Sequence, residues 1–68
     1  MHNIVATGTG FVLIDSRWTV DHGYETAVYE CDHRGQIKSC GDLEVTWYDT
    51  EEEMRKGHES MIEKWRGR

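Results

Sequence analysis

The clearest hydrophobic pattern lies in the last third of the chain. Five side chains there recur at the spacing of one helix face, which repeats every 3.6 residues. They are Met54, His58, Met61, Ile62 and Trp65. Thr50, followed three residues later by Glu53, forms a capping-box motif that satisfies backbone donors of a first helical turn. The pattern therefore predicts a helix over residues 51–66.

Two earlier segments have the period-2 alternation of β-strands. Residues 42–48 alternate polar and apolar side chains, and residues 24–32 form a second strand candidate. The intervening residues 33–36 are typical of a hairpin turn, in which Gly35 adopts a positive φ. We therefore expect an antiparallel pair.

The length of this hairpin loop sets which residues face each other. A two-residue loop at 35–36 pairs Val28 with Leu43 and Tyr24 with Trp47. A loop at Arg34 and Gly35 shifts these pairs but preserves the faces, whereas a bulged three-residue loop changes both. Either two-residue loop places Leu43, Val45 and Trp47 beneath the helix.

Residues 11–14, Phe-Val-Leu-Ile, are apolar at every position, so a strand here needs cover on both faces. The helix covers one face. Residues 18–20 or a second copy of the protein would cover the other, and we favour the second copy. Turns are expected at residues 8–10 and 21–23, and residues 4–7 form a possible short edge strand.

These segments predict a single α+β domain over residues 1–68. We expect a small antiparallel sheet of about three strands with one C-terminal helix packed on one face. A chain of 68 residues with 37% hydrophobic side chains builds only one small core, which self-association often supplements. We therefore expect a homo-oligomer.

Charge and hydropathy narrow the partners. The net charge of −5 opposes a phosphate backbone, so we expect no nucleic-acid partner. The chain shows no signal-peptide pattern and no apolar run near the length of a membrane span. We expect a soluble cytoplasmic protein without a membrane partner.

The two cysteines raise two chemical alternatives. The loop at 35–36 brings Cys31, His33 and Cys40 together as zinc ligands, but a fourth ligand is missing. The same register sets the two cysteines opposite each other, as a disulfide requires. Ordinary thiols are the favoured interpretation, and we expect neither a metal nor a cofactor.

His58 is the candidate general base or pH switch, because its side chain titrates near neutral pH. A histidine packed on the sheet and hydrogen-bonded to a carbonyl or carboxylate is the favoured alternative. Gly8-Thr9-Gly10 is too short for a phosphate-binding motif. We therefore expect no catalytic residues and no enzymatic activity.

The sheet face opposite the predicted helix carries aromatic residues among polar ones, as partner surfaces do. Tyr29 and Tyr48 are the predicted anchors of this surface, together with Trp18 nearby. The alternative is a hydrated face with scattered aromatic side chains.

Residues 24–29, 47–54, 57–59 and 61–65 resemble a family of short uncharacterised bacteriophage and prophage proteins. That family has an "ETxVF"-like strand and a "YxTEEEAxxGHExMVxxW"-like helix. The chain departs from it at Met54, where alanine is usual, and at Tyr29, where phenylalanine is usual. The resemblance covers residues 23–65 and implies a phage origin and a host-cytoplasm setting, without an activity.

These observations predict a small phage-type interaction protein that self-associates and binds a host or phage protein. Inhibition of a host defence or transcription component is one form of this function. The alternative is a binder or sponge for a small, nucleotide-like ligand, with Arg17 and Arg34 converging between subunits beside Trp18, Tyr29 or Trp47. A virion-associated accessory protein is a third class.

Overall fold

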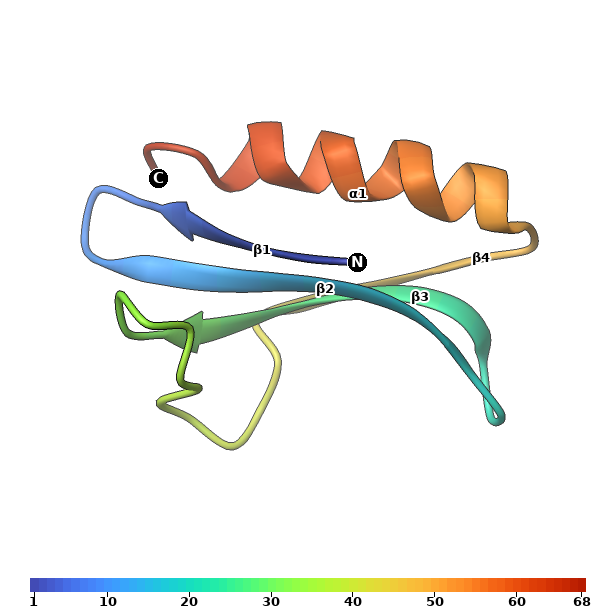
Figure 1. Ribbon diagram of the computed structural model, residues 1–68, viewed down its shortest axis with the longest axis horizontal. Helices are drawn as coiled ribbons and strands as arrows, with labels where there is room; N and C mark the ends of the chain where they lie inside the picture. Colours follow the sequence, from blue (N-terminus) through green and yellow to red (C-terminus); the bar gives the residue numbers. More distant parts are fainter.

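The computed structural model describes all residues, 1–68, as four strands followed by one helix. The strands form one antiparallel sheet in chain order, β1-β2-β3-β4. Figure 1 shows α1 lying across one face, with the β3–β4 connection on the other side. The predicted fold class is confirmed, with four strands instead of about three. The elements are β1 (His2–Ala6), β2 (Phe11–Thr19), β3 (Gly23–Cys31), β4 (Glu44–Tyr48) and α1 (Glu51–Trp65).

The first two connections are tight turns at the predicted positions. Thr7 N–H donates to the Gly10 carbonyl at 2.8 Å, and Gly23 has a φ of 74°. The possible edge strand exists as β1, but it begins at His2. The less favoured alternative, in which residues 18–20 fold over a sheet face, was wrong, because β2 continues in the sheet through Thr19.

The helix closes the hydrophobic core. Its capping box has both reciprocal hydrogen bonds, between the Thr50 side chain and Glu53 N–H and between the Glu53 side chain and Thr50 N–H. The predicted stripe faces the sheet, where four of its five residues are buried and Trp65 packs at the border of the core. The core cluster consists of Val5, Val12, Ile14, Val28, Met61 and Ile62.

A glycine lets α1 approach β4. A Cβ atom on Gly57 would lie 2.1 Å from Tyr48 Oη and 2.3 Å from Tyr48 Cζ. Any other residue at position 57 would therefore collide with the tyrosine ring. Glycine disfavours a helix interior, but here it leaves room for the Tyr48 ring between α1 and the sheet.

The predicted β3–β4 register was wrong. Tyr24 pairs with Tyr48 and Val28 with Glu44, one residue away from the expected pairs. A shift of one residue exchanges the faces of a strand. Tyr48 therefore lies on the helix side, whereas Val45 and Trp47 lie on the opposite side.

The shift has a local cause in residues 32–43, which form a long connection instead of a tight hairpin. The Asp32 carboxylate accepts hydrogen bonds from Gln36 N–H and Arg34 N–H, which hold the pKa of Asp32 below its ordinary value. Gly35 has the expected positive φ of 84°. Cys31 then pairs with Ile37, and the chain leaves the ladder before β4.

Glu44 fixes the register from the helix side. Its carboxylate accepts hydrogen bonds from Lys64 Nζ and from Trp65 Nε1. The Lys64 hydrogen bond is the main reason that the pKa of Glu44 lies below its ordinary value. This contact requires Glu44 to face α1, so it is incompatible with the predicted register, which turns Glu44 to the opposite face.

Candidate functional site

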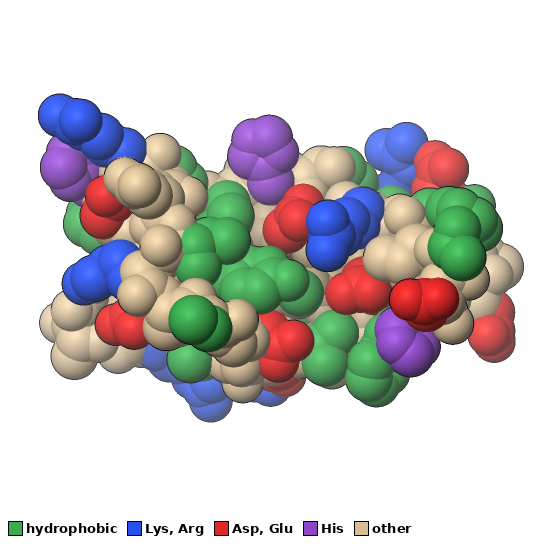
Figure 2. Space-filling view, turned by 90° about the horizontal axis from the view of Figure 1, so that it is seen from below, with side chains coloured by type: hydrophobic (Ala, Val, Ile, Leu, Met, Phe, Trp, Pro, Cys, Tyr) green, Lys and Arg blue, Asp and Glu red, His purple; other side chains and the backbone are tan.

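The sheet face away from α1, here called the open face, carries three of the large exposed apolar side chains, those of Ile4, Phe11 and Trp47. Figure 2 looks onto it and shows hydrophobic side chains gathered across the middle, with acidic and basic groups around them. Trp47 is 52% exposed and Ile4 is 43% exposed. The strand register gives this face Ile4, Phe11, Leu13, Ala27, Tyr29, Cys31, Val45 and Trp47.

Residues 32–43 cover one end of the open face. The His33 ring lies 6.5 Å from the Phe11 ring, measured between centroids, and Gly35 lies against the Ile4 side chain. Cys31 is buried where the chain bridges to Ile37. The second face of the 11–14 segment is thus partly covered by the β3–β4 connection, instead of by residues 18–20.

The predicted anchors do not share one face. Tyr29 lies half-buried on the open face, as expected. The placement of Tyr48 beside it was wrong, because Tyr48 lies on the helix side against Gly57. Trp18 pairs with Tyr24, also on the helix side by strand alternation, and is 59% exposed.

The two arginines of the ligand hypothesis are each related to Asp15 of the same chain. Arg34 lines a hollow of about 290 Å³ together with His2, Ile4, Leu13, Asp15 and Gly35. Arg17 Nε lies 4.0 Å from the carboxylate of Asp15. Asp15 therefore belongs both to the hollow that Arg34 lines and to the ion pair with Arg17.

The cysteines are free thiols in different surroundings. Cys31 is buried and Cys40 is exposed. The register that set them opposite each other was wrong, since Cys31 pairs with Ile37. Burial is the main reason that the pKa of the Cys31 thiol is raised, and the neighbouring Asp32 carboxylate adds to it. No group of three or more possible metal-ligating side chains comes together.

A buried polar network crosses the interface between α1 and the sheet. His58 Nδ1 lies 2.5 Å from Ser16 Oγ, which lies 2.6 Å from Thr26 Oγ1. His58 Nε2 lies 2.7 Å from Asn3 Oδ1. His58 is therefore packed on the sheet as expected, but its partners are a hydroxyl and an amide oxygen.

The network assigns one tautomer to His58. The amide oxygen of Asn3 only accepts, so His58 Nε2–H donates to it and Nδ1 accepts from Ser16 O–H. Thr26 O–H then donates to Ser16 Oγ. Desolvation is the main cause that lowers the pKa of His58, and the positive N-terminus adds to it. The imidazole is thus held neutral.

Serine, histidine and asparagine in one hydrogen-bonded chain have the composition of a nucleophile, a base and an orienting group. Ser16 is 1% exposed and His58 is 0% exposed, so neither offers an atom to a substrate. The arrangement acts as a polar connection between helix and sheet.

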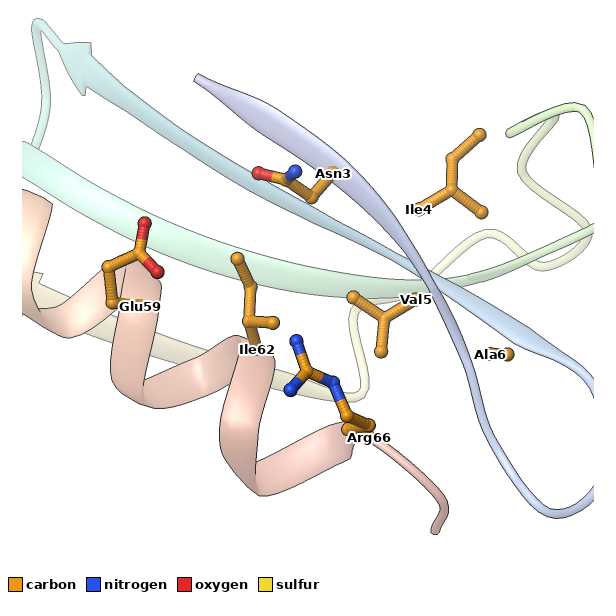
Figure 3. A pocket seen from close by; sticks show the side chains of 7 residues that line it. All are labelled: Asn3, Ile4, Val5, Ala6, Glu59, Ile62 and Arg66. Carbon is orange, nitrogen blue, oxygen red and sulfur yellow. The ribbon is translucent and has the colours of Figure 1, made fainter.

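A groove runs between β1 and α1 at the other edge of the molecule. It has a volume of about 390 Å³, and Figure 3 shows its apolar floor of Val5 and Ile62. The Glu59 and Arg66 side chains stand at either side of Ile62 along the helix. We call this feature the β1–α1 groove.

The backbone of β1 has an unpaired outer edge beside this groove. Met1 and Ser16 exchange two hydrogen bonds, and Thr7 N–H donates to Gly10. Because hydrogen-bonded pairs alternate along an antiparallel ladder, His2, Ile4 and Ala6 direct their N–H and C=O groups away from β2. The Ala6 carbonyl accepts from Gly67 N–H at 3.1 Å, whereas no protein partner is found for His2 and Ile4 on this side.

Sequence reasoning missed the polar network and the groove. Ser16 and Thr26 occupy strand positions in phase with the core residues Ile14 and Val28, and this was the available signal. The groove lacked such a signal, because it depends on where α1 crosses β1.

The structure contains no helix with the length and apolar character needed to cross a membrane. Comparisons with protein-family models, with curated proteins and with solved structures found no match for this chain.

Proposed function

We propose that this chain is a non-enzymatic interaction protein that self-associates and binds another protein through its open face. The observation that carries the proposal is the part of the open face that residues 32–43 leave uncovered, where apolar side chains from all four strands remain accessible beside charged ones. A contiguous apolar patch with a polar rim is typical of a protein-binding surface.

Trp47 is the central candidate anchor. Its ring lies on edge strand β4, half exposed, and the His22 ring holds it from one side at a centroid distance of 5.3 Å. A partly supported tryptophan loses little conformational entropy when a partner covers it, and tryptophan is enriched among binding hot spots. Tyr29 supplies a second aromatic contact on the neighbouring strand.

The charge distribution favours a partner with a basic surface. The net charge is −5, and the open face carries Asp15 and Glu25 against Arg17. Complementary charge raises the association rate. The resemblance to phage proteins supports a bacterial host protein or another phage protein as the partner, and inhibition of a host defence or transcription component is one form of this proposal.

The test is an affinity pull-down from bacterial lysate, with and without infection, read by mass spectrometry. Trp47→Ser should lose the partner, whereas Trp18→Ser, which changes a similarly exposed tryptophan on the other side of the sheet, should retain it. A partner that survives Trp47→Ser, or that is lost only with Trp18→Ser, would contradict the assignment to the open face. Recovery of no partner at all would contradict the binding function.

The hollow lined by Arg34 supports a second candidate, the binding of a small anionic ligand. Arg34 and His2 provide positive or donor groups above the apolar Ile4 and Leu13, and Arg17 lies beside the same Asp15. Purified protein would be heated and the released fraction analysed by mass spectrometry. A nucleotide-like compound released by the wild type and absent from Arg34→Ala would favour this candidate over protein binding.

A further inference from the structure

The outer edge of β1 is an unprotected strand edge. Its five residues, His-Asn-Ile-Val-Ala, include no lysine, carboxylate or proline, and Ile4 is exposed at its centre. Natural edge strands are usually blocked by such residues or by covering segments, because free N–H and C=O groups pair readily with another strand. Here only the Ala6 end is covered, by Gly67.

We propose that a second copy of this chain pairs with β1, antiparallel, about a two-fold axis at Asn3. The inference rests on the proposed self-association and assigns its surface. In this register His2 of one copy faces Ile4 of the other, and each such pair exchanges N–H···O=C hydrogen bonds in both directions. Every outward backbone group of His2 and Ile4 is then satisfied.

The covered end of β1 selects this register. A two-fold axis at Ile4 would bring His2 of the second copy against Ala6, where Gly67 already occupies the carbonyl. An axis at Asn3 leaves Gly67 in place. The two sheets then join into one continuous sheet with both helices on the same face.

The charges beside the groove are self-complementary about the same axis. β1 and α1 run in the same direction (Figure 1), and Glu59 and Arg66 stand on opposite sides of Ile62 along the groove (Figure 3). A two-fold axis reverses this order, so Glu59 of each copy faces Arg66 of the other. Within one chain Arg66 contacts only Glu63, at 3.0 Å in an exposed pair, and remains available.

A symmetric pair also explains how so small a chain would limit further association. A two-fold contact uses the same patch on both copies and is closed, whereas a head-to-tail contact would continue into a filament. Pairing of β1 with β1 removes the uncharged edge from both copies. The other edge strand, β4, carries Glu44 and is followed by Asp49.

Sedimentation velocity over a concentration series tests the charge arrangement. The wild type should form a dimer. Glu59→Arg and Arg66→Glu should each weaken it by about tenfold or more, because each places like charges together twice. The double variant with both changes should regain the wild-type affinity. Lys56→Glu carries the same change of charge as Arg66→Glu outside the groove and should leave the dimer unchanged.

Two substitutions at Ile4 test the backbone pairing. Ile4→Pro removes an N–H that points away from β2, a position at which an edge strand tolerates proline, and should abolish the dimer. Ile4→Ala keeps the N–H and should retain it. Amide exchange of wild-type Ile4 provides the same information without a variant, since its protection should increase with protein concentration.

The outcomes separate this inference from the proposed function. A wild type that stays monomeric throughout, with an unprotected Ile4 amide, overturns the self-association on which the inference rests. A dimer whose affinity is unchanged by the substitutions at Ile4, Glu59 and Arg66 supports self-association and overturns the β1 pairing. Partner binding through the open face is measured separately by the Trp47 variant.

Discussion

His58 is neutral in the folded protein because it lies in a dry, hydrogen-bonded interface. Its nitrogens are matched to one acceptor and one donor, Asn3 and Ser16. A second proton would force Nδ1–H toward Ser16 and reverse the hydroxyl donors, leaving Thr26 O–H without an acceptor in the network. The negative groups Glu59 and Asp15 favour the charged form but do not outweigh desolvation.

This arrangement predicts a pH dependence of stability. The folded-state pKa of His58 lies below its ordinary value, so the unfolded state binds the proton first. The free energy of unfolding should be at its full value above about pH 6.5. It should decrease below that, by at most about 1.4 kcal/mol per pH unit, until the folded-state pKa is reached.

Urea unfolding between pH 5 and pH 8 measures this dependence. His58→Gln should lower stability by about 1–3 kcal/mol at pH 8 through imperfect hydrogen bonding and should flatten the curve in this range. Asp32 and Glu44, whose pKa values are lowered, contribute only at more acidic pH. An unchanged slope in His58→Gln would contradict the assignment.

Gly57 is the residue whose replacement should reveal the helix–β4 contact. Alanine is favoured over glycine by about 1 kcal/mol in a helix interior, but its Cβ collides with Tyr48. Gly57→Ala should therefore destabilise the protein by about 1–3 kcal/mol in urea unfolding. Gly41→Ala is the matched control, because a Cβ atom at position 41 would point into open space and the backbone there does not have a positive φ. Stabilisation by Gly57→Ala would show that Tyr48 moves aside freely.

Among the elements, α1 owes a defined start to its capping box. Thr50→Ala removes the hydroxyl that accepts the hydrogen bond from Glu53 N–H. Only the hydrogen bond from the backbone N–H of residue 50 to the Glu53 carboxylate would remain. The loss should be about 1 kcal/mol in unfolding free energy. Thr9→Ala, in an exposed turn, should change it by less than about 0.5 kcal/mol. Equal effects of the two changes would argue against the cap.

The elements differed in how far the sequence predicted them. α1 was predicted to within one residue because its stripe and its cap are both local patterns. The β3–β4 register was not predicted. The Asp32 turn has no hydrophobic periodicity that would reveal it, and the contact of Glu44 with Lys64 and Trp65 joins residues that are distant in sequence. An open sheet face was predictable, because one helix covers only one side of the sheet. The wrong register placed Tyr48 on this face, where the structure has Trp47.

At the scale of the whole molecule, the reactivity of the two thiols measures whether the fold unfolds cooperatively. Cys40 is exposed, whereas Cys31 is buried and has a raised pKa. A thiol reagent should modify Cys40 quickly. It should modify Cys31 at a far lower rate, because little of the Cys31 thiol is ionised and little of it is accessible. A Cys40→Ser variant isolates the slow reaction.

The dependence of the slow reaction on urea then tests cooperativity. If residues 32–43 belong to the cooperative unit, the labelling of Cys31 should follow global unfolding with the same denaturant dependence. Labelling that is independent of urea would indicate that this connection opens while the sheet stays intact. Equal initial rates for Cys31 and Cys40 would contradict the burial of Cys31.

The position of α1 at the end of the element order has a consequence for synthesis on the ribosome. The strands pair in chain order, and hairpins form in about 1–10 μs. The last 20 residues, which include α1, take roughly 1–4 s to be added at about 5–20 residues per second. The apolar side of the nascent sheet therefore waits for its cover on a timescale far longer than strand pairing. A chain truncated before α1 would keep that surface uncovered and would be a substrate for chaperones and proteases.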